Sequence, residues 1–151
     1  MKFSYVLPDP ATYRDWAEFE GDLGCAKQPG YDAVELQIAD PAAFDEERVR
    51  KALQKAGLPM CAFQTGASYA TCGNCLCTAD EAVRDRTVKL LMSFVDLAAR
   101  WNAVIVVGSL QGRLKDEPDR ATGAARIRDA LRRVGEYAGL KRATVAFEPV
   151  N

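Results

Sequence analysis

The chain alternates short apolar runs with longer segments whose apolar residues recur at helical spacing, and it does so along its whole length. Short apolar runs predict strands, and apolar residues three to four positions apart predict amphipathic helices. Strands that alternate with helices form a parallel sheet, because each helix carries the chain back to the edge where the next strand begins. We expect strands at residues 2–7, 31–39, 59–65, 103–108 and 143–148.

Helices are expected between these strands, and several of their ends carry cap signals. Asp45 and Asp80 each precede a helical pattern, as N-cap residues do, and Gly57 follows the first of these patterns as a C-cap glycine would. Thr12 is the expected N-cap of an earlier helix. Residues 66–78 are expected to form a long loop, and the unbroken apolar run at 103–108 predicts a strand buried on both faces.

Two architectures accommodate this order, an open doubly wound sheet and part of a (β/α)8 barrel. The first strand is followed by Leu7-Pro8-Asp9-Pro10, so the glycine-rich turn of dinucleotide-binding folds is absent. Within the second strand, Val34 and Leu36 share one face while Glu35 and Gln37 share the other. An open sheet covered by helices on both faces is apolar on both. We therefore expect an α/β fold with five parallel strands, the first half of a TIM barrel.

The composition of the chain limits the kinds of binding partner and catalysis that we expect. The chain has 151 residues, enough for a single domain over residues 1–151, and a net charge of −1 from 20 basic and 21 acidic residues. Without a basic excess, neither a nucleic acid nor a membrane surface is expected as a partner. The beginning of the sequence resembles no export signal, so a cytoplasmic location is expected. Histidine is absent, which excludes catalysis by an imidazole of this chain.

Ligands on parallel α/β sheets bind beyond the carboxyl ends of the strands. Glu148 lies at such an end, on the same expected face as Thr144 and Ala146, and Pro149 follows it. A carboxylate in this place can bind Mg²⁺ or Mn²⁺ or act as a base, and the alternative is a solvated or arginine-paired strand end. We expect Glu148 to face the barrel interior near Glu35 or Gln37.

Other polar residues at strand ends or on the inner face are candidate substrate contacts. Arg113 is suited to a phosphate or carboxylate, although an exposed loop arginine is the more common role. Glu35, likewise, more commonly only binds its neighbours inside a barrel. The candidate substrate-binding residues are Glu35, Gln64, Ser109, Arg113 and Asn151.

Five cysteines are present, and three of them lie in the stretch Cys72-Gly73-Asn74-Cys75-Leu76-Cys77. The odd number of cysteines favours reduced thiols over a disulfide framework. A closed zinc site needs about four ligands, and Cys61 is a poor fourth because it lies within a strand. Metal binding, a redox role and a loop that covers substrate therefore all stay open.

The stretch Phe147-Glu148-Pro149-Val150-Asn151 resembles the E-P-x-N motif on the fifth strand of xylose isomerase-like TIM barrels. This family includes sugar and sugar-phosphate isomerases and epimerases and the family 2 AP endonucleases. Further stretches are similar to its second strand, third helix and fourth strand, so that the resemblance covers essentially the whole chain. These stretches are Tyr31-Asp32-Ala33-Val34-Glu35-Leu36, Val83-Arg84, Asp96-Leu97-Ala98 and Val107-Gly108-Ser109.

The resemblance implies a metal-dependent isomerase or epimerase that transfers a proton next to a carbonyl through an enediolate. It implies one divalent metal, Mn²⁺ or Mg²⁺ with Zn²⁺ as an alternative, whose first ligand is Glu148. In the epimerases that glutamate is also one of two acid/base carboxylates. The remaining ligands and the second carboxylate would lie beyond residue 151.

The nuclease branch of the family is not expected here. Its members would require histidine ligands near the ends of the third and fourth strands, where this chain has Gln64-Thr65-Gly66 and Gly108-Ser109-Leu110. A sugar is the expected ligand. The alternatives are a lyase or dehydratase acting on a cyclitol or keto-sugar, and a non-catalytic truncated half-barrel. Five strands cannot close an eight-stranded barrel, so we expect self-association or a missing C-terminal half.

Overall fold

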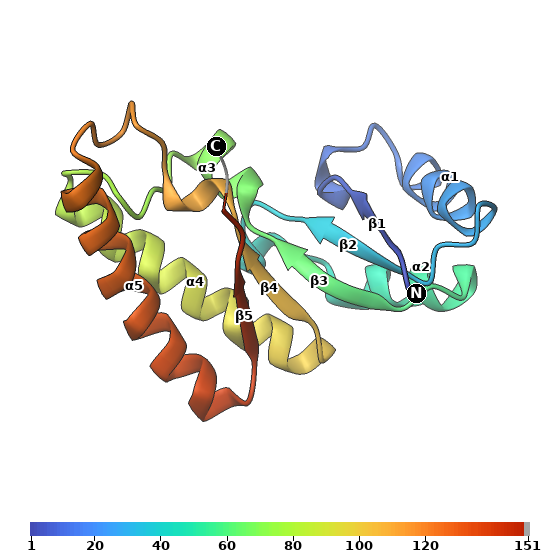
Figure 1. Cartoon of the computed structure of the whole chain (residues 1–151). Coiled ribbons are helices and arrows are strands. Elements are labelled where there is room, and N and C mark those ends of the chain that lie inside the picture. The colour runs from blue at the N-terminus through green and yellow to red at the C-terminus, as the bar shows by residue number, and fades with distance from the viewer. Residues whose placement is uncertain (150–151) are drawn as a thin grey trace.

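The computed structural model describes residues 1–149, in which five strands form one parallel sheet in the order β1-β2-β3-β4-β5 (Figure 1). The order in the sheet is the order along the chain, which is how a TIM barrel is built. The α/β fold with five parallel strands, half of a barrel, is thus confirmed. The strands are β1 (Ser4–Leu7), β2 (Ala33–Gln37), β3 (Met60–Gln64), β4 (Val104–Val107) and β5 (Thr144–Phe147).

Helices connect the strands, and α1 packs against α2 as α4 does against α5 (Figure 1). Among the described residues, none of the helices combines the length and the apolar character needed to cross a membrane. The α-helices are α1 (Trp16–Lys27), α2 (Glu46–Ala56), α3 (Gly66–Cys72), α4 (Glu81–Trp101) and α5 (Arg120–Lys141), and the short 3-10 helices are η1 (Pro10–Thr12), η2 (Pro41–Ala43) and η3 (Ser109–Gln111).

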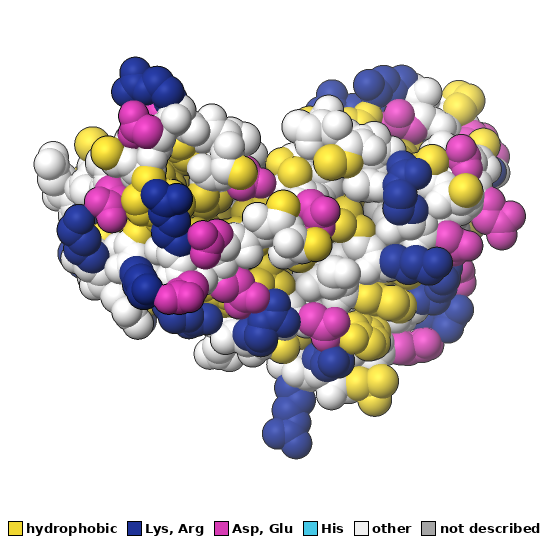
Figure 2. Space-filling view, turned by 180° about the vertical axis from the view of Figure 1, so that it is seen from behind, with side chains coloured by type: hydrophobic (Ala, Val, Ile, Leu, Met, Phe, Trp, Pro, Cys, Tyr) yellow, Lys and Arg dark blue, Asp and Glu magenta, His cyan; other side chains and the backbone are white. Residues whose placement is uncertain are grey.

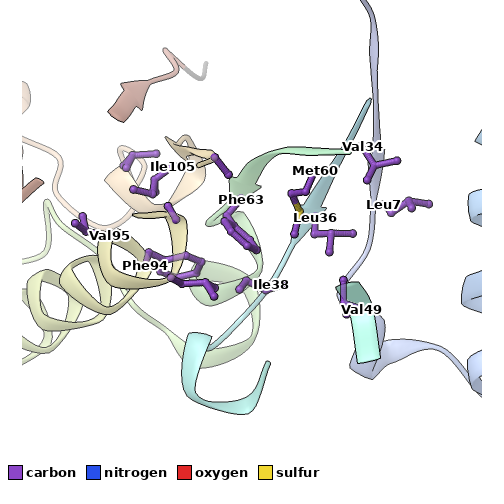
Figure 3. Close-up of a cluster of buried hydrophobic side chains, with 14 of the residues drawn as sticks. Leu7, Val34, Leu36, Ile38, Val49, Met60, Phe63, Phe94, Val95 and Ile105 are labelled. Atoms are coloured by element: carbon purple, nitrogen blue, oxygen red, sulfur yellow. The ribbon is translucent and has the colours of Figure 1, made fainter. Parts of the chain in front are cut away.

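The hydrophobic core lies between the helices and one face of the sheet. Val34, Leu36, Phe63 and Ile105 project from the strands into this layer and are fully buried. Figure 3 shows these side chains gathered with Phe94 of α4. The alternation predicted for β2 is therefore observed, with its apolar residues on the helix-covered face and Glu35 and Gln37 on the opposite, inner face.

The fourth strand differs from the prediction of a strand buried on both faces. Ile105 and Val107 are buried against the helices, whereas Val104 and Val106 are only half-buried. The two half-buried valines lie on the inner face. Residues 1–149 supply no layer over this face, so apolar character in sequence does not translate into burial there.

Local cap chemistry explains where α2 and α4 begin and where α2 ends. The Asp45 carboxylate accepts a 3.0 Å hydrogen bond from the Arg48 backbone N–H, and the Asp80 carboxylate caps α4 in the same way. Gly57 closes α2 with φ of 64°, a left-handed conformation that glycine adopts without strain. These three predicted caps are confirmed.

The N-terminus of α1 is not capped by Thr12, as predicted, but by Asp15, whose carboxylate accepts from the Glu18 backbone N–H at 3.0 Å. Thr12 instead ends η1, and its hydroxyl donates to the Asp9 carbonyl at 2.7 Å. Pro10 starts this 3-10 turn because its fixed φ suits the first helical position. Because this turn comes first, the α-helix begins only at Trp16.

The predicted loop at 66–78 is helical in its first half, where α3 occupies Gly66–Cys72. This helix has no apolar periodicity, which is why its sequence reads as a loop. Its contacts are long-range: Ser68 donates its hydroxyl to the Ala39 carbonyl, and the Tyr69 hydroxyl donates to Asp116 at 2.8 Å. Tertiary contacts therefore stabilise a helix that is too short to be stable alone.

One irregularity interrupts the ladder between β2 and β3. Val34 pairs with Met60, and the next residue, Glu35, pairs with Ala62, so Cys61 has no partner of its own. The Cys61 thiol donates to the Val34 carbonyl at 3.4 Å. This arrangement is a β-bulge, with one strand carrying one residue more than its neighbour.

Candidate functional site

Glu148 follows the last residue of β5 and lies at the carboxyl end of the sheet. Phe147 pairs with Val107, whose side chain is buried on the helix-covered face, so alternation places Glu148 on the inner face. The Glu148 backbone N–H donates to the Val107 carbonyl at 3.0 Å, which extends the β-ladder by one hydrogen bond. Its side chain is exposed to solvent. A carboxylate in this position is accessible to a small ligand.

A neighbouring amide fixes the backbone of Glu148 from its other side. Gln111, the last residue of η3, donates its side-chain N–H groups to the carbonyls of Gly108 and Glu148, both at 3.1 Å. Sequence reasoning did not single out Gln111. The signal available was a glutamine just after β4, where the carboxyl ends of adjacent strands bring βα loops together.

Glu35 lies at the centre of a hydrogen-bonded group on the inner face. Its carboxylate accepts from the Ser4 hydroxyl at 2.6 Å and from the Gln64 side-chain amide at 2.5 Å. In the sheet, β3 and β4 lie between β2, which carries Glu35, and β5, which Glu148 follows. Glu35 and Gln64 thus bind each other and link β1, β2 and β3.

The other expected substrate contacts are spread over the loops. Ser109 begins η3 and lies beside Gly66 at the start of α3. Arg113 is exposed, its backbone N–H donates to Asp116 at 2.8 Å, and its guanidinium lies 5.5 Å from the centre of the Tyr69 ring. Asn151 lies outside the described residues. The structure therefore joins Glu35 to Gln64, and leaves Ser109 and Arg113 on the neighbouring loops.

The residues at the mouth of the sheet provide too few ligands for a hard cation. Mg²⁺ and Mn²⁺ need several oxygen ligands at once, and Glu148 is one such ligand. Within residues 1–149, three metal-binding side chains converge at one place, and Glu148 is not among them. The described residues thus do not form a complete magnesium or manganese site.

The sheet order, the polar inner face and a carboxylate at the end of β5 agree with one family. The sequence model of the xylose isomerase-like TIM barrel family matches residues 24–151. The chain belongs to this family. The matched residues include β2 to β5 and Glu148. Glu148 and its neighbours therefore lie within the part of the chain that shows the family.

Proteins that resemble the chain include several sugar epimerases. A ketose 3-epimerase of Arthrobacter globiformis is 32% identical over 127 residues, which are 83% of this chain and 43% of that protein. Two crystal structures share the fold with a TM-score of 0.74 each. One is an L-ribulose 3-epimerase, 25% identical, matched over 97% of this chain and 49% of its own.

The other is a D-allulose 3-epimerase from a Methylomonas species, solved with D-allulose, at 21% identity. The match covers 99% of this chain and 52% of that enzyme. This chain therefore spans about half the length of the relatives that it matches. At this identity the second structure supports the shared fold alone.

Proposed function

We propose that this chain forms the first half of an epimerase that transfers a proton at the carbon next to the carbonyl of a ketose. The observation that carries the proposal is the position of Glu148, an exposed carboxylate at the carboxyl end of β5 on the inner face of a half-barrel. The similarity to a ketose 3-epimerase supports the substrate class.

In this proposal Glu148 is one of two acid/base groups. Its carboxylate takes the proton from the carbon beside the carbonyl, which leaves an enediolate, and a second group returns a proton to the opposite face. The hydrogen bonds from Glu148 N–H to Val107 and from Gln111 to the Glu148 carbonyl hold its backbone in place. A fixed backbone limits the positions that the carboxylate can adopt, which favours a productive orientation toward the reacting carbon.

The proposal extends to a divalent metal, Mn²⁺ or Mg²⁺, with Glu148 as one ligand. Such a metal would polarise the carbonyl and adjacent hydroxyl of the sugar. Since Glu148 belongs to no group of three or more converging metal-binding side chains within residues 1–149, the proposal includes further ligands from outside these residues. Ser109 and Gln64, at the ends of β4 and β3, are proposed to bind hydroxyl groups of the sugar.

The test measures exchange at the reacting carbon. The complete product of the gene that encodes this chain is incubated with D-fructose in D₂O and Mn²⁺, and deuterium at carbon 3 is followed by NMR together with the 3-epimer. Glu148→Gln should lower the rate by about 10²–10⁴-fold, the usual contribution of a positioned acid/base group.

The matched control is Glu136→Gln, which removes an exposed carboxylate on α5 that binds Arg132. This variant should exchange at the wild-type rate. If Glu148→Gln also exchanges at that rate, Glu148 is not an acid/base group. If the wild-type protein exchanges no deuterium into D-fructose or other ketoses, ketose epimerisation is not its function.

A further inference from the structure

Two thiols and a carboxylate converge on the loops that follow β3 and β4. Cys75 and Cys77 are buried with their sulfur atoms 3.7 Å apart. The ligand atoms of Cys75, Cys77 and Asp116 all lie within 4.8 Å of one another. Cys72 is exposed and does not belong to this group. The fold therefore brings Cys75 and Cys77 together, and not Cys72 and Cys75, the two cysteines of the CxxC motif.

The spacing of the two sulfur atoms is that of two ligands on one tetrahedral metal ion. Zinc–sulfur bonds of about 2.3 Å at tetrahedral angles place the two sulfurs about 3.8 Å apart. A carboxylate oxygen in the third position would lie about 3.6 Å from each sulfur by the same geometry. The Asp116 oxygen therefore needs to move by roughly one ångström at most.

Gly112 leaves the space on which these three side chains converge. A Cβ atom at this position would lie 2.3 Å from the Cys77 sulfur, 2.6 Å from the Cys75 sulfur and 3.5 Å from the Asp116 carboxylate. Gly112 has φ of 96° and ψ of 179°, a backbone conformation essentially restricted to glycine. The loop thus avoids a side chain at the one point where all three groups meet.

Further hydrogen bonds hold the Asp116 carboxylate and the backbone of Cys77 in place. The Tyr69 hydroxyl and the Arg113 backbone N–H both donate to Oδ2 of Asp116 at 2.8 Å. Within residues 1–149 no donor binds the other oxygen of this carboxylate. Arg126 donates to the Cys77 carbonyl at 2.9 Å and also binds Glu117. Hydrogen bonds of this kind orient metal ligands in known sites.

We propose that Cys75, Cys77 and Asp116 bind one thiophilic divalent cation, Zn²⁺, with water in the fourth position. Two thiolates select Zn²⁺ over the hard cations Mg²⁺ and Mn²⁺. Cys77 also lines a surface pocket of about 680 Å³, together with Gly112 and Arg113, and in this proposal the fourth ligand is a water from that pocket. This site is separate from the metal proposed for Glu148, and it does not depend on that proposal.

Binding exchanges protons for the metal. Burial and the hydrogen bond with Cys75 raise the pKa of the Cys77 thiol to about 12, so this thiol is protonated at neutral pH when no metal is bound. Coordination of Zn²⁺ releases the thiol protons to the solvent, with no change of oxidation state. The bound ion would join the loop after β3 to the loop after β4.

These loops already touch through two backbone hydrogen bonds, from Leu76 N–H to Leu110 and from Cys77 N–H to Gln111. Gln111 is also the residue whose side chain binds the Glu148 carbonyl. The ion would therefore stabilise the loop segment that holds the backbone of Glu148. We expect metal to raise the unfolding temperature of the chain.

The test uses the reduced, metal-free 151-residue chain. Zn²⁺ is titrated in competition with a chromophoric chelator, and Co²⁺ serves as a spectroscopic probe because thiolate ligands give it an intense near-ultraviolet charge-transfer band. We expect one equivalent of Zn²⁺ to bind and to displace Co²⁺. Cys75→Ser and Cys77→Ser should each weaken binding by at least about a hundredfold, since even partners of a ligand commonly contribute 10–100-fold.

Cys72→Ser, in the same segment but exposed, is the matched control and should bind as the wild type does. Asp116→Asn keeps both thiols and should weaken binding with the fold intact, which circular dichroism of the metal-free variant checks. An intense Co²⁺ band retained in both Cys75→Ser and Cys77→Ser, or no stoichiometric binding by the wild type, overturns the proposal. A wild-type chain that binds no Zn²⁺ and forms a Cys75–Cys77 disulfide in air would show a redox pair instead.

Discussion

The side-chain amide of Gln111 donates a 3.1 Å hydrogen bond to the main-chain carbonyl of Glu148. This contact connects the turn after β4 to the end of β5, across the mouth of the half-barrel. Together with the hydrogen bond from Glu148 N–H to the Val107 carbonyl, it fixes the backbone on both sides of the proposed acid/base residue. In the proposed epimerase Gln111 would thus be a positioning residue, which acts on the substrate only through Glu148.

Replacing Gln111 by alanine should lower kcat of the proposed epimerase while the KM for the ketose changes little. A misplacement of about 1 Å can cost up to about a hundredfold in rate, and we expect a loss of about tenfold or more. Steady-state kinetics of the complete gene product provide the measurement. Gln54→Ala, on the outer helix α2, is the control. A kcat for Gln111→Ala equal to that of the control would remove Gln111 from the positioning role.

Gly112→Ala should destabilise the chain by about 2–4 kcal/mol. The backbone conformation of Gly112 alone costs other residues about 1–3 kcal/mol, and the new methyl group would overlap both sulfur atoms. Gly135→Ala in α5 is the matched control, since no atom lies within 4 Å of its added Cβ. That change should stabilise the chain by about 0.5–1 kcal/mol, as for Gly to Ala within a helix. Urea unfolding of both variants measures the difference, and equal effects would contradict the close approach of the thiols.

Glu46 makes the stability of the chain depend on pH. Hydrogen bonds from Arg100 at 2.5 Å and from Trp101 at 2.9 Å lower the pKa of its carboxyl group in the folded state. A lowered folded-state pKa stabilises the protein above the unfolded-state pKa of about 4.3, and this stabilisation is lost as the pH falls through the folded-state pKa.

Glu46→Gln should therefore lower the free energy of unfolding by about 1 kcal/mol at pH 7, and the difference from wild type should shrink and vanish as the pH falls through the lowered folded-state pKa of Glu46. Glu47→Gln, one residue further along α2, removes an exposed carboxylate that binds Lys51 and should have a smaller effect. Denaturation series from pH 7 down through the acidic range give the comparison. A difference that grows as the pH falls would have the wrong sign for this ion pair.

The isolated 151-residue chain should self-associate. In the described residues β1 and β5 are the edge strands, and Val6 and Phe147 on them are 43% and 46% exposed. Exposed edges and apolar side chains favour pairing with another chain. Light scattering after size-exclusion chromatography should show a mass that rises with concentration.

Val6→Lys and Phe147→Lys should shift this equilibrium toward the monomer, because a charge on an edge strand opposes pairing. Leu140→Lys is the control: Leu140 is more exposed than either residue, but it lies on α5 and away from the edges. If the wild-type chain stays monomeric and unfolds cooperatively, the inner face and edges do not drive association.

How much of this structure the sequence predicts depends on how local each cause is. The caps at Asp45, Gly57 and Asp80 are set by residues within one turn, and all three are predicted correctly. The alternation of β2 is equally local. α3 is missed because contacts from Ser68 and Tyr69 to distant residues stabilise it.

The candidate sites follow the same distinction. The position of Glu148 at a strand end can be read from the sequence, because strand ends are marked by apolar runs and proline. The convergence of Cys75 and Cys77 with Asp116 cannot, since the aspartate comes from another loop and no spacing rule connects them. Gln111 is missed for a related reason: only the fold shows which backbone carbonyl its amide reaches.

The β-bulge at Cys61 bears on how this family can vary in length. With Cys61 removed, Val34 would still pair with Met60 and Glu35 with Ala62, now as consecutive pairs in a regular ladder. Both partners of each pair would keep their faces, since Val34 and Met60 belong to the core and Glu35 lies on the inner face. A one-residue deletion in a strand normally reverses every side chain beyond it. At this position it would reverse none, so gain or loss of a residue here can be absorbed without moving Gln64 from its place beside Glu35.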